Sequence, residues 1–149
     1  LWIIVFESIS AFIGRATQTD VDSWYATLTA PAFTPPDIAF PVMWTILYAL
    51  IAATGWTLWR QRSRDKARLP LLLFALYMAL NWSWSFVFFG AHLLLGGFIW
   101  IIALNIVAIA LITLSWRRQM RTPALLMIPP TLWTIFAAYL NGGYWWLNS

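Results

Sequence analysis

The sequence contains little charge and no cysteine. Charged residues make up 9% of its 149 positions, whereas hydrophobic residues make up 62%. A soluble domain is typically about 25% charged and about 45–50% apolar, so this chain could not cover a surface that faces water. Disordered chains are poor in apolar and aromatic residues, which excludes that class as well. Without cysteine, the chain can form no disulfide, thiolate metal site or cysteine nucleophile.

Acidic residues and histidine are also scarce. With one histidine and five acidic residues, the chain has few side chains that could bind a metal or act as a general acid or base. We therefore expect no catalytic residues, no metal ligands and no obligatory cofactor. Most of the nine basic residues lie in two clusters at the edges of apolar runs. That placement is typical of membrane proteins and does not favour nucleic acid as a partner.

Five apolar runs follow one another along the chain and predict an all-α integral membrane protein. The last four runs contain about 22 residues each, and a helix of that length crosses a hydrocarbon core of about 30 Å. Segments in lipid must satisfy their own backbone hydrogen bonds, so the runs should be helices in one five-helix bundle. The first run is shorter, and we expect a few residues before Leu1. The predicted spans are 1–16, 38–59, 69–90, 93–116 and 124–146, within a single domain over 1–149.

Two of the segments between the spans are basic. Residues 60–68 carry five basic side chains, and residues 117–121 carry three more. With five spans, both segments lie on the same side as the N-terminus, which the positive-inside rule places in the cytoplasm. We therefore expect a bacterial cytoplasmic membrane, with the N-terminus inside and the C-terminus outside. The alternative is an outer membrane, where insertion follows other rules.

The connection over residues 17–37 is the longest between the predicted spans and lies on the side opposite the basic segments. Three prolines restrict its backbone, so we predict a semi-rigid lid over any cavity that opens on that side. Its prolines are Pro31, Pro35 and Pro36, and its acids are Asp20, Asp22 and Asp37.

Tryptophan is unusually abundant, with 12 residues. Seven lie near the ends of spans, as in an interfacial aromatic belt. Five lie deeper, which favours a cavity for a flat apolar ligand, with packing between helices as the alternative. The belt residues are Trp2, Trp24, Trp56, Trp59, Trp116, Trp145 and Trp146, and the deep ones are Trp44, Trp82, Trp84, Trp100 and Trp133.

Polar and small residues share helical faces with three of the deep tryptophans. Residues three or four positions apart lie on one face of a helix, and three such stripes at matching depth would enclose one pocket beneath the lid. The stripes that we expect to bind ligand are Trp44 with Tyr48, Asn81 with Trp84, and Trp133 with Ala137 and Asn141.

Three other features of the spans lead to predictions. Asn105 lies at mid-depth and should form hydrogen bonds between helices. Glu7 is the only carboxylate inside a predicted span and is therefore a candidate functional residue. Small residues that recur every four positions let helices approach closely, either in a homodimer or within the bundle. They are Ala75, Ala79 and Ser83.

Three motifs resemble those of the translocator protein family, also called the tryptophan-rich sensory protein, TspO/MBR or peripheral-type benzodiazepine receptor family. They cover nearly the whole chain in the family's order, and the chain resembles a bacterial member. The motifs are residues 24–31 (WYATLTAP) with 35–36, 40–41 and 44–48 (WTILY), residues 79–85 (ALNWSWS) with 88–90, and the pairs 132–133, 136–137 and 140–141.

The resemblance implies a five-helix membrane bundle that is commonly a homodimer. It implies binding of protoporphyrin IX, haem-like tetrapyrroles, sterols, and benzodiazepine or isoquinoline drugs. By motif, Trp44, Asn81, Trp133 and Ala137 would line the pocket, with Tyr25 in the lid. We therefore expect a membrane sensor that regulates tetrapyrrole or stress responses. The alternatives are light-dependent porphyrin degradation without a conventional catalytic site, and transport of porphyrin or sterol.

Overall fold

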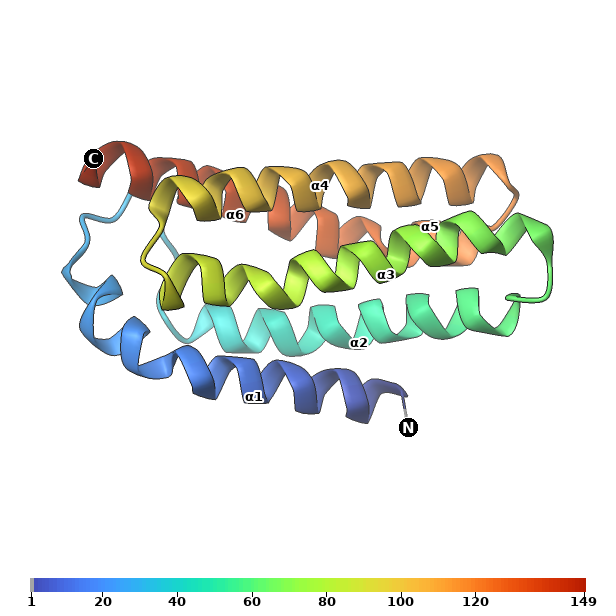
Figure 1. Ribbon diagram of the computed structural model, residues 1–149, viewed down its shortest axis with the longest axis horizontal. Helices are drawn as coiled ribbons and strands as arrows, with labels where there is room; N and C mark the ends of the chain where they lie inside the picture. Colours follow the sequence, from blue (N-terminus) through green and yellow to red (C-terminus); the bar gives the residue numbers. More distant parts are fainter. Residues whose placement is uncertain (1) are drawn as a thin grey trace.

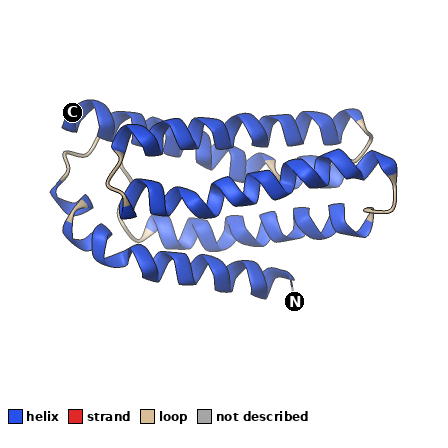
Figure 2. Cartoon of the chain, in the orientation of Figure 1, coloured by secondary structure: helices blue, strands red, loops and turns tan. Residues whose placement is uncertain are grey.

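The chain folds into long helices joined by short connections (Figure 2). The computed structural model describes residues 2–149, except for the side chains of residues 17–22, so Asp20 and Asp22 of the predicted lid lie outside the described side chains. The elements are α1 (Trp2–Ser23), the 3₁₀ turn η1 (Tyr25–Thr27), α2 (Ala39–Arg60), α3 (Asp65–Ser85), the π-helical turn η2 (Phe86–Gly90), α4 (Leu94–Arg117), α5 (Arg121–Leu126) and α6 (Ile128–Asn148).

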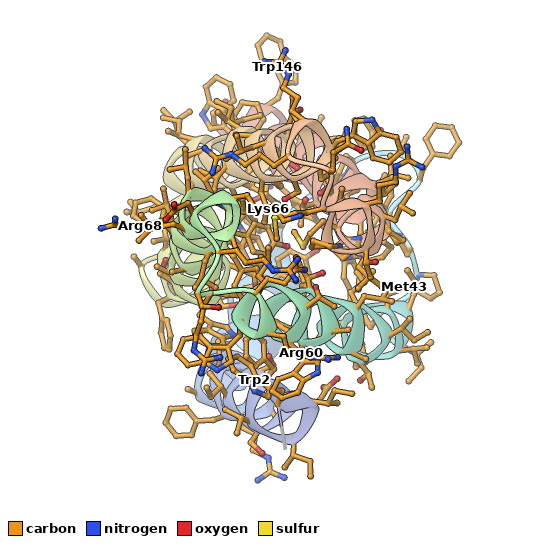
Figure 3. The ribbon with its side chains drawn as sticks, turned by 90° about the vertical axis from the view of Figure 1, so that its right-hand side faces the viewer. Trp2, Met43, Arg60, Lys66, Arg68 and Trp146 are labelled. Carbon is orange, nitrogen blue, oxygen red and sulfur yellow. The ribbon has the colours of Figure 1, made fainter. Side chains whose placement is uncertain are left out.

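The long helices lie side by side and alternate in direction (Figure 1). One end of the bundle holds the N-terminus, the α2–α3 turn and the α4–α5 turn, and we call it the basic end. Figure 3 looks onto it, with Arg60, Lys66 and Arg68 labelled. The other end holds the C-terminus and residues 24–38, which connect α1 to α2 and which we call the covering loop. The two basic segments therefore lie together, at the end opposite this loop.

Among the described residues, four helical segments are long and apolar enough to cross a membrane: Ala39–Arg60, Asp65–Gly90, Leu94–Arg117 and Arg121–Asn148. They correspond to α2, α3 with η2, α4, and α5 with α6. Many of their large apolar side chains face outward, as expected where lipid is the solvent; Ile106 is 63% exposed and Leu132 is 62% exposed. The chain is thus an all-α protein with four apolar helical segments of spanning length beside α1.

The first and third helices extend beyond the predicted spans. The first helix continues to Ser23 instead of ending near residue 16, because the polar residues that follow the apolar run can still form helix. The lid is therefore shorter than residues 17–37. The third helix begins at Asp65, four residues before the predicted start, with its acidic side chain in the first turn.

Pro70 lies inside α3, where it deprives a carbonyl in the preceding turn of its hydrogen bond. The Nη1 group of Arg118 lies 3.1 Å from the carbonyl oxygen of Lys66 and 3.3 Å from that of Asp65, and donates to both. A basic side chain from the end of α4 thereby satisfies the backbone that proline leaves open. In the last span, the helix breaks at Met127, just before Pro129 and Pro130.

Hydrogen bonds inside the bundle join α4 to α6. The Nδ2 group of Asn105 donates to the carbonyl of Thr134 at 3.0 Å, and the hydroxyl of Thr134 donates to Oδ1 of Asn105 at 2.8 Å. Both side chains are buried. The prediction that Asn105 forms hydrogen bonds between helices is therefore confirmed.

Candidate ligand-binding cavity

A cavity of about 400 Å³ lies between the helices beneath the covering loop, and we call it the aromatic cavity. Its volume lies within the range of about 300–1,000 Å³ that is typical of small-molecule sites. Seven of the eight residues predicted to bind ligand line it together. They are Tyr25, Trp44, Asn81, Trp84, Trp133, Ala137 and Asn141.

Flat ring surfaces make up much of the cavity wall. The rings of Trp84 and Phe88 are stacked, with centroids 5.2 Å apart and an angle of 17° between their planes. Phe89 meets Phe88 edge-on at 5.0 Å. On the opposite side, Trp133 meets Phe40 edge-on at 6.1 Å. A planar apolar molecule would find ring faces and ring edges to pack against, the two arrangements that aromatic groups prefer.

The sequence pattern missed Phe89, Ile101 and Leu104 of the wall. Phe88 and Phe89 are neighbours, yet both line the cavity, because the π-helical turn η2 changes the direction of successive side chains. Ile101 and Leu104 add an apolar wall from α4. Both belong to a stripe of apolar residues three and four positions apart in the sequence. No motif accompanies this stripe, so the sequence did not predict that it lines a cavity.

The polar side chains of the cavity are held in fixed orientations. Tyr48 donates from its hydroxyl to Oδ1 of Asn81 at 2.5 Å. Trp84 donates from Nε1 to Oδ1 of Asn141 at 3.3 Å, while Nδ2 of Asn141 donates to the carbonyl of Ala137 at 2.8 Å. Tyr48 itself does not line the aromatic cavity but lies behind Asn81. Tyr48 is therefore placed to orient the amide of Asn81, and not to contact a ligand in the aromatic cavity.

The five deep tryptophans divide into two groups. Trp44, Trp84 and Trp133 line the aromatic cavity, whereas Trp82 and Trp100 do not. Trp100 joins α4 to α3, since its Nε1 group lies 3.2 Å from the carbonyl oxygen of Leu80 and is bonded to it. The ring of Trp82 packs against Phe6 of α1 at 5.5 Å. Packing between helices thus accounts for two of the five, and the cavity for three.

The covering loop is held against α6 by hydrogen bonds. The hydroxyl of Tyr25 donates to that of Tyr144 at 2.7 Å, and both residues line the cavity. Burial, and then this hydrogen bond, raise the pKa of Tyr25 well above its ordinary value. Further along the loop, the backbone N–H of Thr29 donates to Oδ1 of Asn148 at 2.8 Å, and Nδ2 of Asn148 donates to the carbonyl of Thr29 at 3.0 Å.

A second cavity of about 330 Å³ lies between α1, α2 and α3, and we call it the side cavity. It shares Trp44, Asn81 and Trp84 with the aromatic cavity. Its own lining is more polar and includes Glu7, Ser10, Thr45 and Tyr48.

The small residues of α3 lie on an outward face. Ala75 and Ala79 are exposed, whereas Ser83 is partly buried. The hydroxyl of Ser83 donates to the carbonyl of Ala79 at 2.6 Å and accepts a hydrogen bond from Nε1 of Trp100 at 3.1 Å. Two of the three residues are therefore placed where another helix could approach.

The chemistry of the aromatic cavity is that of binding. Its polar groups are amides, hydroxyls, indole N–H groups and the carboxylate of Asp37. In the part of the chain whose side chains are described, no three histidine or acidic residues gather where they could hold a metal ion. Aromatic faces with a few oriented donors and acceptors suit a flat, largely apolar molecule.

Comparison with known proteins gives a consistent picture. The family model described as TspO/MBR family matches residues 2–147. The tryptophan-rich protein TspO of Chlorobaculum tepidum is 36% identical over 138 residues, covering 87% of this chain and 83% of that protein. The protein of the same name from Archaeoglobus fulgidus is 35% identical over 133 residues, covering 89% and 85%. The translocator protein of Homo sapiens is 29% identical over 141 residues, covering 93% and 83%.

Proposed function

This chain belongs to the TspO/MBR family, and we propose that it binds porphyrins such as protoporphyrin IX and haem-like tetrapyrroles inside the membrane as a sensor of tetrapyrrole or stress state. It is an integral membrane protein, which its family and its four apolar helices support. Sterols and planar drugs of the benzodiazepine or isoquinoline type are further proposed ligands of the same cavity.

One observation carries the proposal: three deep tryptophans and three phenylalanines line a single cavity. A macrocycle has large apolar faces, which would stack on Trp84 with Phe88 and on Trp133. Because Tyr48 occupies the oxygen of the Asn81 amide, the donor that Asn81 presents is its amide nitrogen. A carboxylate or carbonyl of the ligand would accept from it.

We also propose that α1 crosses the membrane as a fifth span. Its length of 22 residues equals that of α2. Near the basic end, the ring of Trp2 lies 6.2 Å from that of Trp56 and 6.1 Å from that of Trp59, so α1 starts at the depth where α2 ends. With five spans, the basic segments and the N-terminus would face the cytoplasm of a bacterium, and the covering loop and C-terminus would face outward.

A homodimer is the proposed assembly, formed through the exposed small residues of α3. Ala75 and Ala79 would let a second copy's helix approach closely. Replacing Ala79 by leucine should then shift the purified protein from dimer to monomer in light scattering. Replacing Leu72, exposed on the same helix, by alanine should leave the dimer intact.

Quenching of tryptophan fluorescence by protoporphyrin IX in detergent tests the proposed function. Trp133→Leu removes a ring face from the cavity and should weaken binding about fivefold, since aromatic contacts contribute about 0.5–1.5 kcal/mol beyond buried area. The matched control is Trp146→Leu, because Trp146 is 75% exposed and points away from the bundle (Figure 3). Equal affinities of the two variants would contradict the proposal.

A further inference from the structure

The side cavity contains a carboxylate that the proposed porphyrin site does not use. Glu7 lies on α1, seven residues before Gly14, which lines both cavities. The side chain of Glu7 is partly buried and faces this cavity together with Ser10, one turn further along the same helix. A carboxylate at this place, inside the bundle and facing a cavity, is expected to have either a partner or a function.

Nothing in the described part of the bundle neutralises Glu7. The basic residue nearest to it on its own helix is Arg15, two turns away, and no ion pair joins Glu7 to any described side chain. An ionisable group at membrane depth is costly unless it is paired, and such groups usually line pathways or binding sites. A cation from outside the chain would supply such a partner.

The surroundings of Glu7 suit an ammonium group in particular. The hydroxyl of Ser10 donates to the carbonyl of Phe6 at 2.8 Å, so the lone pairs of its oxygen remain to accept from an N–H group. Trp44 lines the same cavity and offers an indole ring, the best of the aromatic side chains at attracting a cation. A carboxylate, a hydroxyl acceptor and an aromatic face together match a protonated amine.

The two cavities are also placed to hold one molecule. Trp44, Asn81, Trp84 and Ser85 line both of them, so the two cavities adjoin across a single layer of side chains. A compound with a flat ring system and a short aminoalkyl arm would place its rings in the aromatic cavity and its amine beside Glu7.

We propose that the side cavity is a subsite for the protonated amine of amphiphilic aromatic amines, with Glu7 as its counter-ion. The proposal rests on the proposed function, because the aromatic cavity holds the rings of such a ligand. It adds a second ligand class, in which charge contributes to selection. A neutral compound of the same shape would keep the contacts with the rings and lose the attraction between its charge and that of Glu7.

A matched pair of fluorescent probes tests this subsite: 1-pyrenemethylamine, which is protonated near neutral pH, and 1-pyrenemethanol, which is neutral. In a neutral detergent, the wild-type protein should bind the amine about tenfold more tightly than the alcohol. Glu7→Gln should remove that preference while it leaves the affinity for the alcohol unchanged. The control is Asp65→Asn, which makes the same change at an exposed position outside both cavities and should retain the preference.

The outcomes separate this inference from the proposed function. If Glu7→Gln binds the amine as tightly as the wild type does, the subsite is refuted, although the ring cavity stands. If Trp133→Leu leaves the affinity for the alcohol unchanged, the ring cavity itself is refuted. A retained affinity for the alcohol in Glu7→Gln also shows that the variant is folded.

Discussion

The hydroxyl of Tyr25 donates a hydrogen bond to the hydroxyl of Tyr144 at 2.7 Å, although the two residues are 119 positions apart in the chain. Their ring centroids are 4.9 Å apart. Tyr25 belongs to the covering loop and Tyr144 to α6, and both line the aromatic cavity. A contact between loop and helix is thus also part of the proposed binding site, so its loss should change how fast a ligand enters and leaves.

Tyr25→Phe should speed up the release of protoporphyrin IX. The substitution keeps the ring and removes the hydrogen bond, whose net contribution is about 1 kcal/mol, so we expect release to be about fivefold faster. Stopped-flow recording of tryptophan fluorescence measures the rate. Tyr139→Phe is the control, because it removes a hydrogen bond of 2.9 Å to the loop carbonyl of Ala32 without changing the cavity wall. The idea fails if both variants release porphyrin at the wild-type rate.

Alkaline pH should have a similar effect. Burial and the hydrogen bond to Tyr144 raise the pKa of Tyr25, so the closed loop favours the neutral phenol. The stabilisation is complete below the pKa of free tyrosine, about 10, and is lost as pH rises from there through the raised value. The release rate of porphyrin should be constant from about pH 8 to about pH 10 and increase above it. Tyr25→Phe should lack this increase, and a rise of equal size in that variant would exclude Tyr25 as its cause.

The covering loop also depends on a glycine of α6. A Cβ atom on Gly143 would lie 2.6 Å from Cβ of Pro31, which is buried and belongs to a rigid ring. Gly143→Ala should therefore push the loop away from α6, at a cost of about 1–3 kcal/mol. Limited proteolysis in detergent should cleave the loop faster than in the wild type. Gly90→Ala adds a methyl group where no atom lies within 4 Å, and should be cleaved at the wild-type rate.

The apolar runs predicted the bounds of a helix well where the apolar residues extend to the ends of that helix. The predicted spans 38–59 and 93–116 differ by one residue from α2 and α4. The first helix was predicted too short, because hydropathy reports where lipid can be and not where the backbone stays helical. Residues 17–23 are mostly polar and yet helical, and hydropathy alone could not predict that the helix continues through them.

The tryptophans show what helical periodicity leaves open. Trp82 and Trp84 are two residues apart, which corresponds to about 200° around a helix, so they cannot share a face. Both belong to the deep tryptophans that favour a cavity, whereas the structure places Trp84 at the cavity and Trp82 against Phe6. Helical periodicity could not predict that Phe89 lines the cavity, because the π-helical turn changes the register of the side chains after Ser85.

Asn105→Ala should destabilise the bundle without weakening porphyrin binding at the proposed site. Its side chain is buried, lies outside the aromatic cavity, and exchanges two hydrogen bonds with Thr134. Removing it leaves the Thr134 hydroxyl without that acceptor, and we expect a loss of about 1–2 kcal/mol in the free energy of unfolding. The midpoint of thermal unfolding in detergent should fall by about 2–4 °C per kcal/mol.

Thr57→Ala is the matched control, since the hydroxyl of Thr57 bonds only within its own helix, to the carbonyl of Thr54 at 2.8 Å. If the two helices are joined by this pair, Thr134→Ala should cost less in the Asn105→Ala background than in the wild type. Additive losses would mean that Asn105 and Thr134 stabilise the bundle independently. In that case, other contacts along α6 would hold this helix, and the covering loop that is bound to it, in the bundle.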